Sequence, residues 1–249
     1  MLTTQIIYLY DGSFEGLLTT IFEIFKHKKL PTDIKPSTNF QSGLDTELIT
    51  ITTTPELAAR VEKSLHRIAG ATVWEEITIG FLSNHADKAM IIYRYICLAI
   101  DKGPQILNYL VRDEVLALHA LKQRTKKEVD RWLGFIRFSK MDNGVYYAAF
   151  EPKDNVTPLI MPHFSERFAD QPFMIHDTKR NIVGVYTLKE WFMIETTAIN
   201  LPDYSQDEYE YRELWKAFYR SVNIPQRRNK ICQQGHLPQW YRTNMVEFL

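Results

Sequence analysis

The hydrophobic pattern of this chain changes period near residue 134, and that change limits the folds open to it. From 71 to 131 the apolar residues recur at helical spacing. Two short β-prone runs follow, 134–138 and 145–150, on either side of Asn143-Gly144, a dipeptide typical of a tight hairpin turn. Helices and strands therefore occupy separate stretches of the chain, which favours an α+β fold.

The segments before residue 71 predict strands and helices in alternation. Residues 5–10 are typical of a strand, and a helix capped by Ser13 follows the turn at Asp11-Gly12. Residues 32–43, rich in Ser, Thr and Asn, are typical of a loop, and 48–52 of a second strand. Pro55 then begins a helix.

The segments after the hairpin complete a ββαββ unit, with a helix over 158–168 and strands over 173–176 and 181–186. We expect a helix-rich single domain over 1–249, with a small antiparallel sheet (the ββαββ core) and a helical C-terminal segment. Its helical part covers approximately 55–133, its ββαββ part approximately 134–187, and its helical C-terminal part approximately 203–249.

Composition and charge exclude several classes of protein. The 249 residues include 30 Lys or Arg and 30 Asp or Glu, so a protein that coats nucleic acid or anionic membranes indiscriminately is excluded. The two cysteines form no CxxC pattern, and we expect neither a metal nor a cofactor. We find no signal peptide and no stretch of about 20 apolar residues, so we expect a cytoplasmic protein without membrane contact.

Two basic stretches are candidate nucleic-acid surfaces. Residues 112–140 hold eight Lys or Arg against four acids, and residues 223–242 hold four Lys or Arg and no acid. Cations interleaved with aromatic rings suit phosphate contact and base stacking. The candidates in these stretches are Lys126, Lys127, Arg131, Arg137, Arg227, Arg228, Asn229, Trp240 and Tyr241.

Each stretch also has a structural interpretation. The residues of the first favour a solvated helix face with Glu128 and Asp130 as local partners over a nucleic-acid surface. The second is typical of a terminal segment that its own aromatic rings pack in place. The acidic stretch 203–213, at net −4, precedes it and offers a partner within the chain.

A third set of polar residues surrounds the ββαββ unit: Glu151, His163, Arg167, His176, Asp177 and Arg180. Glu151, His163 and Asp177 are the catalytic candidates, as general acid or base groups or as ligands. The His-x12-His-Asp spacing matches no established metal motif. Asp177 and Arg180 are equally typical of an ion pair that closes a turn. We find no phosphate-binding loop, nucleophile elbow or zinc-protease motif.

Several segments together resemble an uncharacterised bacterial family labelled as DNA metabolism or DNA repair proteins. They occur in the family's order and spacing: YDGSFEGLL (10–18), 128–138 ending in GFIRF, GVYYAAFEP (144–152), PHFSERF (162–168), MIHDTKR (174–180) and a tail pattern from Ile224 to Glu247. Two departures matter. Asp130 stands where the family usually has His, and the ending Gln239-Trp240-Tyr241-Arg242 carries fewer cations than usual.

The resemblance implies a role in DNA metabolism without implying an activity. Members of the family are encoded beside a radical SAM protein, and elsewhere the same domain is fused to the N-terminus of a uracil-DNA glycosylase-like domain. The resemblance adds Tyr146, Arg167 and Arg180 to the DNA-binding candidates and implies a radical SAM partner and single-stranded or damaged DNA. We keep two alternatives: an enzyme acting on a base or nucleotide, and a protein-interaction subunit without DNA contact.

Overall fold

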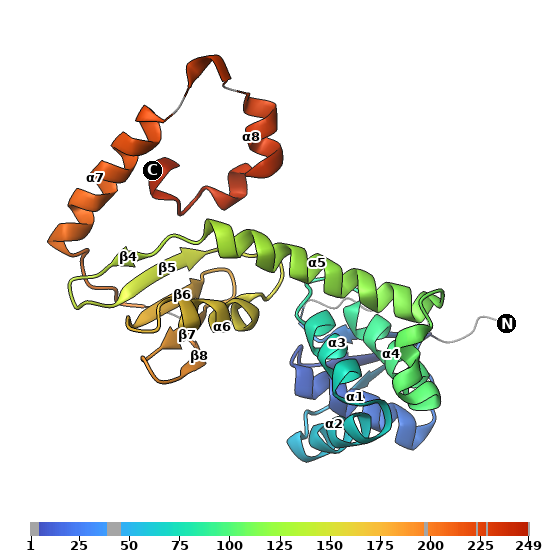
Figure 1. The fold of residues 1–249 in the computed structure, drawn as a ribbon. Helices are drawn as coiled ribbons and strands as arrows, with labels where there is room; N and C mark the ends of the chain where they lie inside the picture. The colour runs from blue at the N-terminus through green and yellow to red at the C-terminus, as the bar shows by residue number, and fades with distance from the viewer. Residues whose placement is uncertain (1–4, 39–45, 197–198, 223, 228, 249) are drawn as a thin grey trace. The chain divides into compact units, whose positions relative to one another are not determined.

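The computed structural model describes residues 5–38, 46–196, 199–222, 224–227 and 229–248 (Figure 1). The chain divides into two compact units, Met1–Thr125 and Lys126–Leu249. The α+β class is confirmed, whereas the expectation of one folding domain stays a prediction. Within the described residues, no helix combines the length and the apolarity that crossing a bilayer requires.

Unit 1 begins with a three-stranded parallel sheet in the order β2-β1-β3. The strands are β1 (Gln5–Tyr10), β2 (Asp33–Pro36) and β3 (Thr46–Thr50), and α1 (Phe14–His27) follows β1. The predicted loop at 32–43 is therefore wrong at β2. This strand carries charges and a proline, and its backbone is held by pairing with Ile7–Tyr10, a long-range contact that local sequence does not reveal.

Helices supply the rest of unit 1. They are α2 (Pro55–Ala69), α3 (Ala71–Phe81), α4 (Lys88–Lys102), the 3₁₀ helix η1 (Gly103–Asn108) and the first part of α5 (Asp113–Phe135). The predicted helix start at Pro55 is confirmed. Side chains of α1, α2 and α4, including Ile21, Leu65 and Ile96, form a core from which water is excluded.

Unit 2 is built on a five-stranded sheet in the order β4-β5-β6-β7-β8. The strands are β4 (Ser139–Lys140), β5 (Tyr146–Phe150), β6 (Phe173–Asp177), β7 (Ile182–Tyr186) and β8 (Trp191–Glu195), and α6 (Thr157–Arg167) connects β5 to β6. The predicted ββαββ order is confirmed, with β8 as an additional edge strand.

Two details of the sheet differ from the prediction. The sheet is mixed rather than antiparallel, because β5 and β6 run parallel on either side of the α6 crossover. The first hairpin strand is Ser139–Lys140 rather than 134–138. Residues 134 and 135 instead end α5, and the Ile136 amide donates to the Trp132 carbonyl, so the helical hydrogen bonding continues into the predicted strand.

The C-terminal part of unit 2 is helical, as predicted. It contains α7 (Gln206–Ser221), η2 (Pro225–Arg227), α8 (Lys230–His236), η3 (Gln239–Tyr241) and η4 (Val246–Phe248). Ser205 caps α7, and Tyr241 packs on Trp132 with ring centroids 4.6 Å apart. Leu237, Trp240 and Tyr241 thus share the core that α6 forms with the sheet.

Candidate nucleic-acid interface

A groove of about 500 Å³ in unit 2 brings together four residues that the sequence selected. Arg137, Tyr146, His163 and Arg167 line it, along with Phe138 and Phe168. They come from the segment after α5, from β5 and from α6. We call this hollow the arginine groove. Its volume lies within the range of pockets that hold a ligand the size of a nucleotide, roughly 300–1,000 Å³.

Helix α6 places two of these side chains on one face. His163 and Arg167 are four residues apart, the spacing at which helical side chains are neighbours, and both are exposed. Among the described residues Arg167 forms no ion pair, so its guanidinium is available to an anion. A planar guanidinium suits phosphate oxygens because it donates two parallel hydrogen bonds.

Aromatic rings form the floor of the groove. The Phe138 ring lies 4.9 Å from that of Phe168 and 5.2 Å from that of Phe164. The Tyr146 ring lies nearly parallel to that of Phe168, at 28° with centroids 6.3 Å apart. Tyr146 and Phe168 remain partly exposed. The floor therefore presents ring surface on which an unpaired base can stack.

Arg137 is held in place at the edge of the groove. Its guanidinium donates to the Gly134 carbonyl at 3.1 Å and to Glu247 at 2.9 Å, and Trp215 donates its indole N–H to the same carboxylate at 3.2 Å. Burial would raise the pKa of Glu247, but the hydrogen bond and charge of Arg137 bring that pKa below its ordinary value. The ion pair fixes Arg137 and neutralises much of its charge.

A second hollow, of about 450 Å³, adjoins the arginine groove and shares Arg137 and Phe138 with it. Its other walls include Tyr211 and Trp215 of α7. Aromatic rings thus flank Arg137 in both hollows. The two hollows together form a continuous surface of unit 2 from α6 to α7.

The cations of α5 extend toward this surface. Lys126, Lys127 and Arg131 are all exposed. Lys127 and Arg131 stand seven and three residues before Gly134, which lines the groove, so they fall on the same side of the helix. Among the described residues these three side chains form no ion pair with a carboxylate.

The three catalytic candidates do not converge. Tyr146 pairs with Phe173 at one end of the parallel strands, and Phe150 pairs with Asp177 at the other, about 13 Å away at roughly 3.3 Å per residue. His163 lines the groove at the Tyr146 end. Glu151 directly follows Phe150 at the opposite end, and its side chain is exposed.

Asp177 has a structural role rather than a catalytic one. It is fully buried, accepts the backbone N–H groups of Lys179 and Arg180 at 3.1 and 3.2 Å, and pairs with the Arg180 guanidinium at 2.8 Å. Arg180 in turn donates to the Pro152 and Lys153 carbonyls. This arrangement is the turn-closing ion pair of the structural interpretation, and it also places Arg180 outside the groove.

The C-terminal candidates are also engaged within the fold. Tyr241 is 2% exposed, and Lys153 lies over the Trp240 ring at 4.3 Å. Asn229 caps α8 by accepting the Cys232 amide at 3.0 Å. Arg227 is exposed on η2, and Arg228 lies outside the described residues. The structure therefore favours the packing interpretation for the two aromatic residues.

Two polar residues with well-defined surroundings were not selected from the sequence. Glu128 is buried and accepts the Lys153 and Asp154 amides at 2.6 and 2.9 Å, so it anchors the loop after β5. The Tyr147 hydroxyl lies 2.8 Å from Nδ1 of His176. Both contacts join residues at least 25 positions apart, and no local pattern signals them.

Among the described residues no three His, Cys, Asp or Glu side chains gather in a group that could hold a metal ion. The comparison with protein families finds one model that matches residues 86–247, described as a domain of unknown function, DUF4130. No curated protein matches the chain. The family model covers α4, α5 and all of the residues that form the arginine groove.

Proposed function

We propose that this chain, which belongs to the DUF4130 family of unknown function, is an accessory protein of DNA metabolism or repair. In this proposal it binds DNA locally at the arginine groove and presents it to a radical SAM partner in the cytoplasm. The observation that carries the proposal is the groove itself, which joins an unpaired arginine to a floor of aromatic rings. The resemblance described above supports the partner and the DNA context.

The chemistry of the groove favours unpaired nucleotides. Arg167 contacts a phosphate, and an unpaired base stacks on Tyr146 and Phe168. In a duplex the base faces are stacked on one another, so they are not available to these rings. Strands that are single or locally opened by damage offer the free base that the groove requires.

We would test this proposal by fluorescence anisotropy with a labelled single-stranded oligonucleotide of about 12 nucleotides, within the site sizes of such modules. Tyr146→Ala is expected to weaken binding about tenfold, because stacking contributes roughly 1–3 kcal/mol per base. Arg167→Ala is expected to weaken it about fivefold through loss of one phosphate contact. The matching duplex is expected to bind more weakly than the single strand.

Lys189→Ala supplies the matched control, because this exposed lysine lies in the turn between β7 and β8 and does not line the groove. Its affinity should stay within about twofold of wild type. Equal binding of duplex and single strand, or an equal loss in the Lys189 and Arg167 variants, would contradict the assignment of the groove.

Helix α7 favours a second function, docking of a protein partner. None of its residues is buried, and Tyr211, Leu214 and Phe218, together with Val222 at its C-cap, are 55–68% exposed. They lie three, four and four positions apart, so they follow one side of the helix. An exposed apolar stripe of this kind is typical of an interaction surface.

The double variant Leu214→Asp/Phe218→Asp distinguishes the two functions. Neither residue lines the arginine groove. We expect loss of co-purification with the radical SAM protein while binding of the single-stranded oligonucleotide is retained. Retained co-purification would exclude α7 as the docking surface and leave the DNA proposal unaffected.

A further inference from the structure

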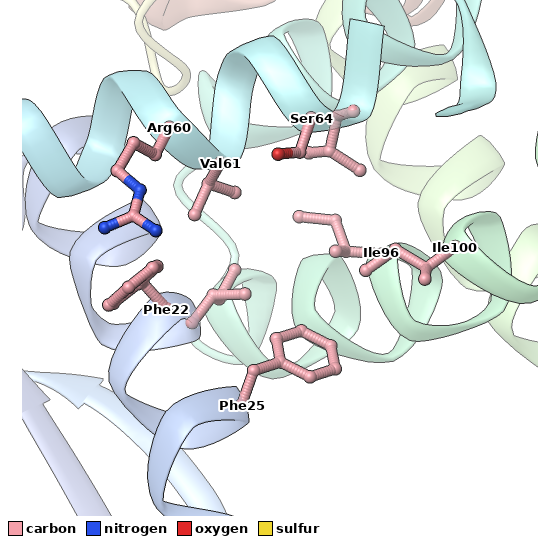
Figure 2. A pocket seen from close by; sticks show the side chains of 9 residues that line it. Phe22, Phe25, Arg60, Val61, Ser64, Ile96 and Ile100 are labelled. Atoms are coloured by element: carbon pink, nitrogen blue, oxygen red, sulfur yellow. The ribbon is translucent and has the colours of Figure 1, made fainter. Parts of the chain in front are cut away.

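Unit 1 contains a cavity of about 180 Å³ that the proposed DNA function does not use. It lies among α1, α2 and α4, and Figure 2 shows the side chains that surround it. Phe22 and Phe25 come from α1, Val61 from α2, and Ile96 and Ile100 from α4. Phe25 and Ile100 are 44% and 40% exposed, so they form the rim.

The size and walls of the cavity fit a small apolar group. An enclosed apolar cavity of about 150 Å³ in a protein is large enough to bind benzene. The present cavity is slightly larger and is lined by phenyl and branched aliphatic side chains. A ring or alkyl chain of about six to eight carbons therefore matches it in volume and polarity.

One end of the cavity is polar and positively charged. The Arg60 side chain lies against Phe22 (Figure 2), and its guanidinium carbon is over the Phe22 ring at 4.9 Å from the centroid. Among the described residues Arg60 forms no ion pair, and the hydroxyl of Ser64, one turn along α2, forms no hydrogen bond. Stacking on Phe22 holds the guanidinium at the entrance without neutralising its charge.

We infer that this cavity binds a small amphiphilic carboxylate. The apolar body of six to eight carbons lies between α1 and α4, and the carboxylate contacts Arg60 and accepts a hydrogen bond from Ser64. The charge of Arg60 selects for an anion over an amine of the same length.

The ligand class can be tested on the full chain by isothermal titration calorimetry with hexanoate, octanoate, octan-1-ol and octylammonium. We expect octanoate to bind more tightly than octan-1-ol, and octylammonium to bind most weakly. Shortening octanoate to hexanoate should weaken binding about fourfold for each methylene that leaves the cavity. Equal affinity of octanoate and octylammonium, or no heat of binding with octanoate, would overturn the inference.

Variants of α2 test the position of the ligand. Arg60→Ala should weaken octanoate binding about tenfold and change octan-1-ol binding less than twofold. Val61→Trp should abolish binding of both by filling the cavity. Lys63→Ala is the matched control, because this exposed cation of the same helix does not line the cavity. An equal loss in the Lys63 and Arg60 variants would place the carboxylate elsewhere.

Two further outcomes are informative. If Val61→Trp does not fold, Ser64→Leu replaces the hydroxyl with a side chain that fills the same space, and it should also abolish octanoate binding. If the octyl compounds bind regardless of charge, Arg60 does not select the ligand and the inferred ligand class is wrong. DNA binding at the arginine groove is not involved in any of these outcomes.

Discussion

His176 shows how burial acts on a single titratable side chain in this fold. Its Nδ1 lies 2.8 Å from the Tyr147 hydroxyl, and its Nε2 is buried without a hydrogen-bond partner. Burial lowers the pKa of His176, and the nearby charge of Asp177 only partly opposes this. The folded chain therefore favours the neutral imidazole, whose Nδ1 forms a hydrogen bond with the Tyr147 hydroxyl.

We predict that this histidine makes the chain less stable at acidic pH. A histidine whose pKa is lowered on folding binds its proton more readily in the unfolded chain. Its contribution to stability is therefore complete above the ordinary pKa of about 6.5 and is lost as the pH falls below that value. Urea unfolding measured between about pH 5 and 8 should show this loss in wild type and a weaker one in His176→Leu.

The difference between the pH profiles of wild type and His176→Leu reports the effect of His176 alone, because the other histidines titrate in both proteins. Tyr147→Phe should keep the pH dependence, since burial is its larger cause. Identical pH profiles for wild type and His176→Leu would show that the imidazole titrates as it does in water.

Residues of the candidate site were predictable from the sequence only where local surroundings decide their role. Arg167 belongs to a family motif and lies on the exposed face of α6, where its charge stays available. Tyr241 is selected from the sequence because its segment is rich in cations and aromatic rings. Its ring is instead buried against Trp132, more than 100 positions earlier in the chain. Whether an aromatic ring stacks on bases or fills a core depends on such long-range packing.

At the scale of elements, the packing of α6 on the sheet depends on Gly184 in β7. A Cβ at this position would lie 2.3 Å from the Met161 sulfur, closer than any ordinary contact. Glycine thus lets α6 approach the middle of the sheet. Since Met161 is fully buried, it has little room to move away.

We predict that Gly184→Ala destabilises the chain by about 1–3 kcal/mol, the cost of overpacking a core, although alanine suits a strand no worse than glycine. Met161→Ala alone should cost about 2–5 kcal/mol through the cavity it leaves. The double variant should be more stable than the sum of the two losses predicts, by about 0.5–3 kcal/mol. Chemical denaturation of all four proteins measures this coupling.

Gly134→Ala is the control that adds a methyl group to a glycine without a clash. No atom lies within 4 Å of a Cβ there, and the residue is helical, so the change should stabilise the chain by up to about 1 kcal/mol. Additive losses in the Gly184 and Met161 variants would show that the sheet relaxes around the new methyl group.

The elements themselves differ in how far local sequence determines them. Helix α2 begins at Pro55, and the hairpin of β4 and β5 turns at Asn143-Gly144, where the helix-start and turn residues predict them. Strand β2 has four residues including Pro36, and only its pairing with β1 makes it a strand. The same holds for the parallel direction of β5 and β6, which follows from the α6 crossover that connects them rather than from either strand.

In the whole molecule 30 basic residues balance 30 acidic ones, but the cations differ in whether a carboxylate neutralises them. In unit 2 many cations are paired internally: Arg137 with Glu247, Arg180 with Asp177, and Lys216 with Glu213. Close to the arginine groove the cations offered to a polyanion are few: Arg167 and the exposed Lys126, Lys127 and Arg131 of α5. Binding of nucleic acid by this chain should therefore depend on ring stacking as much as on charge.

The small number of unpaired cations near the groove predicts a weak dependence of DNA binding on salt. Each phosphate neutralised on a single strand contributes about −0.7 to the slope of the logarithm of affinity against the logarithm of salt concentration. Two or three contacts give a slope of about −1.5 to −2 for wild type. Arg167→Ala should reduce its magnitude by about 0.7, whereas Tyr146→Ala should lower the affinity and leave the slope unchanged. Anisotropy titrations at several salt concentrations measure both, with Lys189→Ala as the control. A wild-type slope steeper than about −4 would mean that many more cations contact the strand than this surface provides.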